Sequence, residues 1–139
     1  MTTIRRVTSG SHWESAIGYS RAVRVGPWVH VSGTAATSPD GGAVGGDNVE
    51  AQAEEVFRRI GHTLMEAGAA LDDVVRTRIF LTDITDWEVV GRAHGRVFNI
   101  ARPATTIVQV SKLVDPSLLV EVEADAYVSA RDEEPDYGA

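Results

Sequence analysis

The 139-residue sequence contains no cysteine, which excludes disulfide bonds, a thiolate nucleophile and cysteine-bound metal. It also lacks an excess of basic charge, because 13 lysines and arginines stand against 20 acidic residues and give a net charge of −7. Proteins that bind nucleic acid usually carry a basic patch or stripe, so we expect no nucleic-acid partner. No apolar run approaches membrane-spanning length, and the N-terminal Met-Thr-Thr-Ile-Arg-Arg lacks the apolar segment of a signal peptide. These absences predict a soluble cytoplasmic protein without a membrane partner.

Motifs for metals, cofactors and a nucleophilic serine are missing as well. The histidines are His12, His30, His62 and His94. None of them has the spacing of a metal ligand, and we expect surface or core positions for them. The glycine-rich stretch 41–46 has neither the lysine of a phosphate-binding loop nor a dinucleotide fingerprint. Ser32 precedes a glycine at the end of a predicted strand, without the context of a nucleophile elbow, so we expect it to make a turn or ligand hydrogen bond. These motifs therefore predict neither a histidine-bound metal nor a cofactor held by its phosphates.

What is present fits a single folded domain over residues 1–129. Hydrophobic residues make up 43% of the chain and charged residues 24%, which are ordinary values for a globular protein. A chain of this length can form a two-layer hydrophobic core. Residues 130–139 are acidic and contain a proline and a glycine, so they predict a frayed tail.

Hydrophobic periodicity predicts an α+β protein with a mixed sheet. The first half is expected to contain a strand at 4–8, an irregular polar segment at 9–20, a hairpin of strands at 22–25 and 28–32, and a mobile flap at 37–47. A helix follows from the capping box Asp47–Glu50 to Gly68, and then a strand at 74–82. A second helix is expected from the capping box Thr85–Glu88 to Phe98, and two strands lie within 102–128. One apolar stripe is expected on each helix: Val49, Ala53, Val56, Phe57, Ile60 and Leu64 on the first, and Trp87, Val90, His94, Val97 and Phe98 on the second. Both helices therefore pack on one face of the sheet, and the uncovered face favours self-association.

The last predicted strand sorts its side chains by parity. Apolar residues alternate with Glu121, Glu123 and Asp125, whose side chains lie roughly 7 Å apart along one face. Such a row could serve acid–base chemistry or bind a metal ion through oxygen ligands. It could also pair with arginines on a neighbouring strand, and Arg76 and Arg78 have the matching parity. We favour this pairing for Glu123 and Asp125.

Several ordered segments resemble the Rid family of reactive intermediate deaminases, also labelled YjgF or endoribonuclease L-PSP. The segments are Gly18-Tyr-Ser-Arg-Ala-Val, Val29-His-Val-Ser-Gly33, Asn48 to Leu64 with Gly68, Thr77-Arg-Ile-Phe-Leu-Thr-Asp83, Arg102-Pro-Ala-Thr-Thr-Ile-Val-Gln-Val, and Leu119-Val-Glu-Val-Glu-Ala-Asp-Ala. The resemblance covers roughly residues 15–128. It implies a chorismate-mutase-like α+β fold, a homotrimer, and small-molecule clefts between subunits.

The resemblance also implies a hydrolase that needs no metal or cofactor. Deaminases of this family hydrolyse enamine or imine products, such as 2-aminoacrylate, to 2-oxo acids and ammonia. Position by position, Tyr19 and Glu121 match the residues that hold and activate water. Ser32 matches the serine of the strand-end Ser-Gly pair.

The clamp for the substrate carboxylate is the main departure from the family pattern. Thr105 occupies the position of the arginine that holds this carboxylate, and Ile107 replaces a common cysteine. The nearest arginine is Arg102, and in an extended chain it would have the opposite parity and lie about 10 Å from Thr105. The sequence thus resembles a branch without the carboxylate clamp, in which Thr105, Ile107, Arg102 and Ser32 line the substrate site.

Three functions remain open at this stage. The first is a hydrolase of imines or related small molecules with Glu121 as general base. The second is a non-catalytic protein that binds a metabolite or a partner at the same cleft. The third is RNA cleavage, which the acidic net charge and the absence of a histidine pair argue against.

Overall fold

The computed structural model describes residues 2–130, so most of the predicted tail lies outside the described residues. The helices and strands in chain order are β1 (Ile4–Val7), α1 (His12–Ile17), β2 (Ala22–Val25), β3 (Trp28–Ala35), α2 (Val49–Glu66), β4 (Val74–Leu81), α3 (Trp87–Val97), β5 (Ala104–Gln109) and β6 (Val120–Tyr127). Short 3-10 turns, Leu71–Asp73 and Ile84–Asp86, precede β4 and α3. The order of helices and strands matches the prediction, apart from α1.

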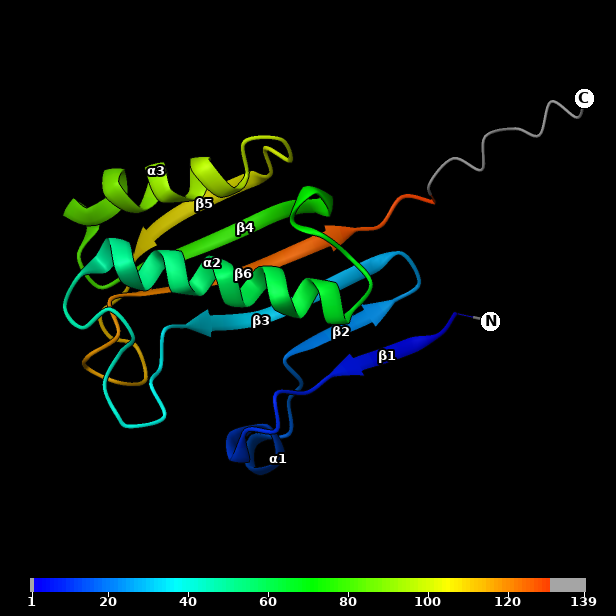
Figure 1. Ribbon diagram of the computed structural model, residues 1–139, viewed down its shortest axis with the longest axis horizontal. Helices are drawn as coiled ribbons and strands as arrows, with labels where there is room; N and C mark the ends of the chain where they lie inside the picture. The colour runs from blue at the N-terminus through cyan, green and yellow to red at the C-terminus, as the bar shows by residue number, and fades with distance from the viewer. Residues whose placement is uncertain (1, 131–139) are drawn as a thin grey trace, which may run out of the picture.

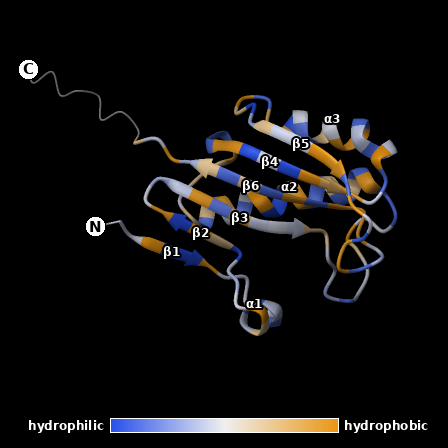
Figure 2. Ribbon diagram, turned by 180° about the vertical axis from the view of Figure 1, so that it is seen from behind, coloured by the Kyte–Doolittle hydropathy of each residue, from blue (hydrophilic) through white to orange (hydrophobic). Residues whose placement is uncertain are grey.

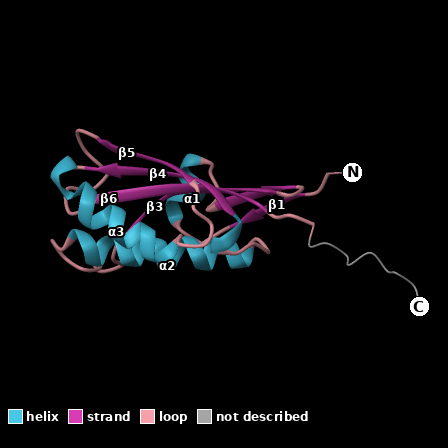
Figure 3. Cartoon of the chain, turned by 90° about the horizontal axis from the view of Figure 1, so that it is seen from above, coloured by secondary structure: helices cyan, strands magenta, loops and turns pink. Residues whose placement is uncertain are grey.

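Six strands form one mixed sheet in the order β1-β2-β3-β6-β4-β5 (Figure 1). β5 runs parallel to β4, whereas every other neighbouring pair is antiparallel. α2 and α3 contact each other and cover the same face of the sheet (Figure 3). Within residues 2–130 no helix covers the opposite face, which we call the open face. The predicted α+β fold with two helices on one face is confirmed.

The core lies between this sheet and the two long helices. β6 buries every second residue, and α2 supplies the bulkiest side chains, Phe57, Ile60 and Leu64, none more than 1% exposed. Burying one such side chain contributes about 1.5–3 kcal/mol. The stripe predicted for the second helix is wrong at Trp87, which is 55% exposed. The buried stripe of α3 begins only with Val90, so the first turn of this helix faces solvent.

The predicted capping boxes are both wrong in register. Asn48, rather than Asp47, is the N-cap of α2, and its side chain accepts a hydrogen bond from Ala51 N–H at 3.0 Å. Asp83 caps the 3-10 turn before α3 by accepting from Thr85 N–H at 3.0 Å. Several polar side chains next to a helix can all accept such a bond, and the path of the preceding loop decides which one does. The left-handed cap at Gly68 is confirmed, with φ of 77°.

The segment 9–20, predicted as irregular, contains the six-residue helix α1. Ser11 caps it by accepting a hydrogen bond from Trp13 N–H at 3.2 Å. The buried side chain of Glu14 accepts hydrogen bonds from Thr8 Oγ1 at 2.9 Å and from Ser9 N–H at 3.2 Å. Burial alone would raise the pKa of Glu14, but these bonds and the nearby charge of Arg21 hold it below its usual value. One buried carboxylate thus fixes a helix that is too short to show hydrophobic periodicity.

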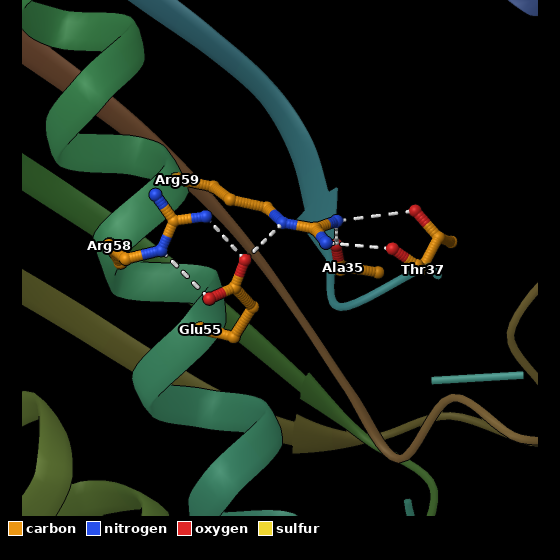
Figure 4. A network of polar contacts seen from close by, with 5 residues as sticks. All are labelled: Ala35, Thr37, Glu55, Arg58 and Arg59. Atoms are coloured by element: carbon orange, nitrogen blue, oxygen red, sulfur yellow. Dashed lines mark hydrogen bonds and ion pairs between the residues drawn. The ribbon is translucent and has the colours of Figure 1, made fainter. Parts of the chain in front are cut away.

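Hydrogen bonds from α2 hold the N-terminal end of the loop 37–47 (Figure 4). Arg59 donates hydrogen bonds to Ala35 O and Thr37 O, each at 2.7 Å. Glu55 holds the same guanidinium at 2.9 Å, and hydrogen bonds from Arg58 and Arg59 lower the pKa of Glu55 to about 2. The movement of this loop as a flap stays a prediction.

The open face carries the predicted pairing of acids with arginine. Figure 2 shows hydrophilic and hydrophobic residues alternating along β4 and β6. Arg78 pairs with Glu123 at 3.1 Å and with Asp125 at 3.4 Å, and His30 pairs with Asp125 at 2.8 Å. Arg76 lies opposite Asp125 in the strand register, but its side chain reaches Thr106 instead. The pairing is confirmed for Arg78.

Candidate functional site

A β-bulge in β3 shapes one half of the candidate site. Val31 and Thr34 both face the core, opposite Ala124 and Val122 of β6, so two residues lie between them where regular pairing would place one. The bulge contains Ser32, whose hydroxyl donates to Ser20 O at 2.6 Å. It thereby joins the bulge to the segment before β2. Because β3 continues to Ala35, the predicted position of Ser32 at the end of a strand is wrong.

Glu121 lies against this bulge on the open face. A Cβ atom at Gly33 would come within 2.9 Å of Glu121 Oε1, so glycine is what leaves room for the carboxylate. Burial raises the pKa of Glu121 above its ordinary value. The positive charge of Arg21 lowers this pKa in part, and Glu123 raises it further. A half-buried carboxylate with a raised pKa suits a general base.

Arg21 links the residues around this carboxylate. Its Nη2 donates to Gly33 O at 2.5 Å, and its guanidinium lies 5.8 Å from the centre of the Tyr19 ring. Its backbone carbonyl accepts from Ser32 N–H at 3.0 Å. The structure therefore gathers the predicted residues Tyr19, Ser32 and Glu121 around an arginine, and we call these four residues the Glu121 group.

Arg21 was not among the residues predicted for this site. The only signal was its place two residues after Tyr19 in a segment that resembles the Rid family. Tyr19 itself is positioned by α1, because its N–H donates to Glu14 O at 3.0 Å. The buried Glu14 and the short helix that it fixes thus support the site.

Thr105 lies on the other face of the sheet. In the strand register Thr105 lies opposite Thr77 of β4, and Thr77 lies opposite Ala124 of β6. Thr77 and Ala124 both face the helix-covered core. Glu121 pairs with Phe80 and has the opposite parity. Within one chain the structure does not bring Thr105 and Glu121 together.

Thr105 belongs to a second polar group beneath α3. Thr77 Oγ1 is hydrogen-bonded to Thr105 Oγ1 and to His94 Nε2, each at 2.8 Å, and His94 Nε2 lies 3.5 Å from Thr105 Oγ1. The imidazole packs on Phe98, with ring centres 4.5 Å apart. Burial lowers the pKa of His94, so the imidazole is neutral at pH 7. We call Thr77, His94 and Thr105 the His94 group.

Ile107 and Arg102 lie on the same side as the His94 group. The side chain of Ile107 reaches towards α3 at Gly91. Arg102 has a left-handed backbone with φ of 45°, so the expected extended path from Arg102 to Thr105 is wrong, and with it the parity argument. Arg102 lines a hollow of about 270 Å³ together with His94, Gly95, Phe98, Asn99 and Pro103.

The described part of the chain offers no metal site and no long apolar helix. Among residues 2–130, no three histidine or acidic side chains are placed to hold one ion. No helix in this range is both long and apolar enough to cross a bilayer.

One known protein family matches the part of the chain that contains both polar groups. The model of the endoribonuclease L-PSP family matches residues 10–128. The chain belongs to this family, also known as the YjgF or Rid family. The matched range includes every residue of the Glu121 and His94 groups.

Relatives of this Rid-family chain include named deaminases. Human 2-iminobutanoate/2-iminopropanoate deaminase is 34% identical over 88% of this chain and 90% of that protein. An uncharacterised Streptomyces coelicolor protein is 40% identical over 93% of this chain and 96% of that protein. The crystal structure of a YjgF-family member from Mycobacterium tuberculosis has 52% identity and a TM-score of 0.82, and it covers 91% of this chain and 100% of that one.

Proposed function

We propose that the chain is a hydrolase of small imines and enamines that acts at clefts between the subunits of a homotrimer. The observation that carries this proposal is the half-buried carboxylate of Glu121, held against Gly33 with Arg21 beside it. The similarity to 2-iminobutanoate/2-iminopropanoate deaminases supports the same chemistry. Because Thr105 and Glu121 face opposite sides of one sheet, a cleft that contains both needs two chains.

The proposed reaction needs only water, a base and positioning. Glu121 accepts a proton from a water molecule as its oxygen attacks the imine carbon, and a C–O bond forms while the C=N double bond becomes single. Glu121 then returns this proton to the nitrogen, which gives a carbinolamine. It next transfers the hydroxyl proton of the carbinolamine to the same nitrogen, the C–N bond breaks, and ammonia leaves as the carbonyl forms. An enamine is first protonated at carbon to give the imine. Tyr19 and Ser32 orient water and substrate, as the family resemblance implies.

A dehydratase-coupled assay tests this proposal. Threonine dehydratase releases 2-iminobutanoate, and formation of 2-oxobutanoate is followed with and without the purified protein. We expect wild type to accelerate the release and Glu121→Ala to reduce that acceleration about 100-fold, because the general base is lost. Glu88→Ala removes an exposed glutamate that pairs with Arg92 on α3, and it serves as the matched control with unchanged activity.

Acceleration that survives Glu121→Ala would show that this residue is not the base. The variant Thr105→Arg places a guanidinium at the family's clamp position. A gain by this variant where wild type shows no acceleration would favour the second candidate function, a non-catalytic metabolite-binding protein. The neutral hydroxyl of Thr105, hydrogen-bonded to Thr77, is the observation behind that candidate. The homotrimer is tested by sedimentation, where a monomer would contradict the proposed cleft.

A further inference from the structure

Two arginines lie side by side at the β1 edge of the sheet (Figure 1). Arg5 of β1 is directly opposite Arg24 of β2 in the strand register, so both side chains extend from the same face. This face is the helix-covered one, because both side chains reach the C-terminal end of α2. Like charges directly opposite each other destabilise a strand pair, so we expect a compensating negative charge nearby.

The end of α2 supplies only part of this compensation. Arg5 Nη2 donates to Glu66 O, and Arg24 Nη1 donates to Ala67 O at 2.8 Å and to Gly68 O at 3.2 Å. The carbonyl groups at a helix C-terminus together carry about half a negative elementary charge, whereas two guanidinium groups carry two full positive charges. Among the ion pairs within residues 2–130, none includes either arginine. A net positive charge therefore remains here, on a chain that is acidic overall.

The two guanidinium groups converge on one point. A Cβ atom at Gly68 would lie 2.8 Å from Arg24 Nη1 and 4.0 Å from Arg5 Nη1. One group with several acceptor oxygens can therefore contact both arginines. The hydrogen bonds within residues 2–130 use Nη2 of Arg5 and Nε and Nη1 of Arg24. Nε and Nη1 of Arg5 and Nη2 of Arg24 are thus able to donate to a ligand.

A hollow of about 670 Å³ lies at these arginines. It is lined by Thr2, Thr3, Arg5, Arg24 and Gly26, which include two cations, two hydroxyl groups and no carboxylate. The volume falls within the usual range of small-molecule sites and exceeds that of a bare phosphate ion. A phosphate monoester has three acceptor oxygens and up to two negative charges, so it can accept from both arginines and a threonine. A carboxylate has two oxygens in one plane and suits a single bidentate arginine better.

We propose that this hollow binds the phosphate group of a small phosphate monoester. The site is separate from the proposed hydrolase cleft and does not depend on it. Arg24 lies opposite Val29 near the start of β3, whereas Glu121 lies opposite Ala35 at the end of this strand and on the other face of the sheet. Six residues of a strand span about 20 Å. A ligand in the hollow therefore does not contact the Glu121 group.

Calorimetry at low salt with inorganic phosphate and with glycerol 3-phosphate tests the site. We expect wild type to bind both, and glycerol 3-phosphate more tightly, because the hollow has room for the organic part. Arg5→Gln should weaken both affinities at least about 10-fold, since charge-assisted hydrogen bonds are lost. Arg6→Gln removes the next arginine of β1, whose side chain has the opposite parity, and it serves as the matched control with nearly unchanged affinity.

The variant Thr2→Glu separates binding from the hydrogen bonds that hold the end of α2. It keeps both arginines and adds a carboxylate to the lining of the hollow. We expect it to lose both ligands while its melting temperature stays that of wild type. Absence of binding to wild type, or wild-type affinity in Arg5→Gln or Thr2→Glu, would overturn the proposal. Equal affinity of wild type for the two probes would limit the site to free phosphate and overturn the monoester.

The dehydratase-coupled assay keeps this test apart from that of the hydrolase. Arg5→Gln and Thr2→Glu should both retain wild-type activity, because neither residue belongs to the Glu121 group. Phosphate binding by a wild-type protein without dehydratase-coupled activity would refute the hydrolase alone. Activity without phosphate binding would refute the phosphate site alone.

Discussion

The Glu121 group and the His94 group both hold a half-buried titratable side chain, but they surround it differently. Burial raises the pKa of Glu121, the positive charge of Arg21 opposes this effect, and the negative charge of Glu123 adds to it. Around His94 lie two threonine hydroxyls and the rings of Phe57 and Phe98, and burial alone lowers its pKa. One side of the sheet thus keeps a carboxylate whose charge is balanced by an arginine, whereas the other keeps a neutral hydrogen-bonded chain. This difference supports the proposal that proton transfer takes place at the Glu121 group rather than at the His94 group.

The largest effect is expected from Gly33→Ala in the Glu121 group. The added Cβ would lie 2.9 Å from Glu121 Oε1 and 3.1 Å from Cδ, so the carboxylate must move. A displacement of about 1 Å at a catalytic group can cost about 100-fold in rate. We therefore expect kcat in the dehydratase-coupled assay to fall by that order, while the melting temperature changes little because the side chain that yields is flexible.

A second glycine provides the matched control on the other side of the sheet. A Cβ at Gly91 in α3 would meet Ile107 Cδ1 at 3.9 Å, which is an ordinary contact. Gly91→Ala should stabilise the fold by about 0.5–1 kcal/mol through helix propensity and leave kcat unchanged. A fall in kcat in this variant as large as that in Gly33→Ala would remove the distinction between the two groups.

The next effect concerns the hydrogen-bonded chain of the His94 group. Thr77 is fully buried, and its hydroxyl contacts both His94 and Thr105 at 2.8 Å. Thr77→Val keeps the shape but leaves these two groups without their shared partner, which should cost about 1–3 kcal/mol of unfolding free energy in urea denaturation. A stability equal to that of wild type would show that His94 and Thr105 pair directly without Thr77.

The two groups also differ in how far sequence could predict them. The alternation of apolar and acidic residues in the sequence predicted that Glu121, Glu123 and Asp125 share one face of β6, and the alternating burial along this strand confirms it. The same local signals predicted the order of the main helices and strands and the left-handed cap at Gly68. The fold of the site's scaffold was therefore accessible from sequence.

Features that depend on loop geometry were not accessible. The left-handed turn at Arg102 accompanies a hydrogen bond from its N–H to Phe98 O at the end of α3, whereas an extended chain is expected for a residue before proline. α1 depends on the hydrogen bonds of one buried glutamate, and the approach of Arg21 to Gly33 depends on the bulge in β3. These contacts join residues whose pairing leaves no periodic signal in the sequence.

The smallest effect, and the most direct test of the comparison, is a pair of opposite pH dependences. The folded-state pKa of Glu121 is raised above its ordinary value of 4.5, so burying the carboxylate costs nothing below pH 4.5, and the cost grows as pH rises through the folded-state pKa. The pKa of His94 is lowered from 6.5, so its burial costs nothing above that pH, and the fold loses stability as pH falls below it.

Relative to wild type, Glu121→Gln should gain more unfolding free energy at pH 8 than at pH 4, and His94→Gln should gain more at pH 5 than at pH 8. Each difference should be less than about 1.4 kcal/mol, because both side chains are partly solvated. Urea unfolding at these pH values measures both differences. If the stability gain of both variants changed with pH in the same direction, the two groups would not differ in the way proposed.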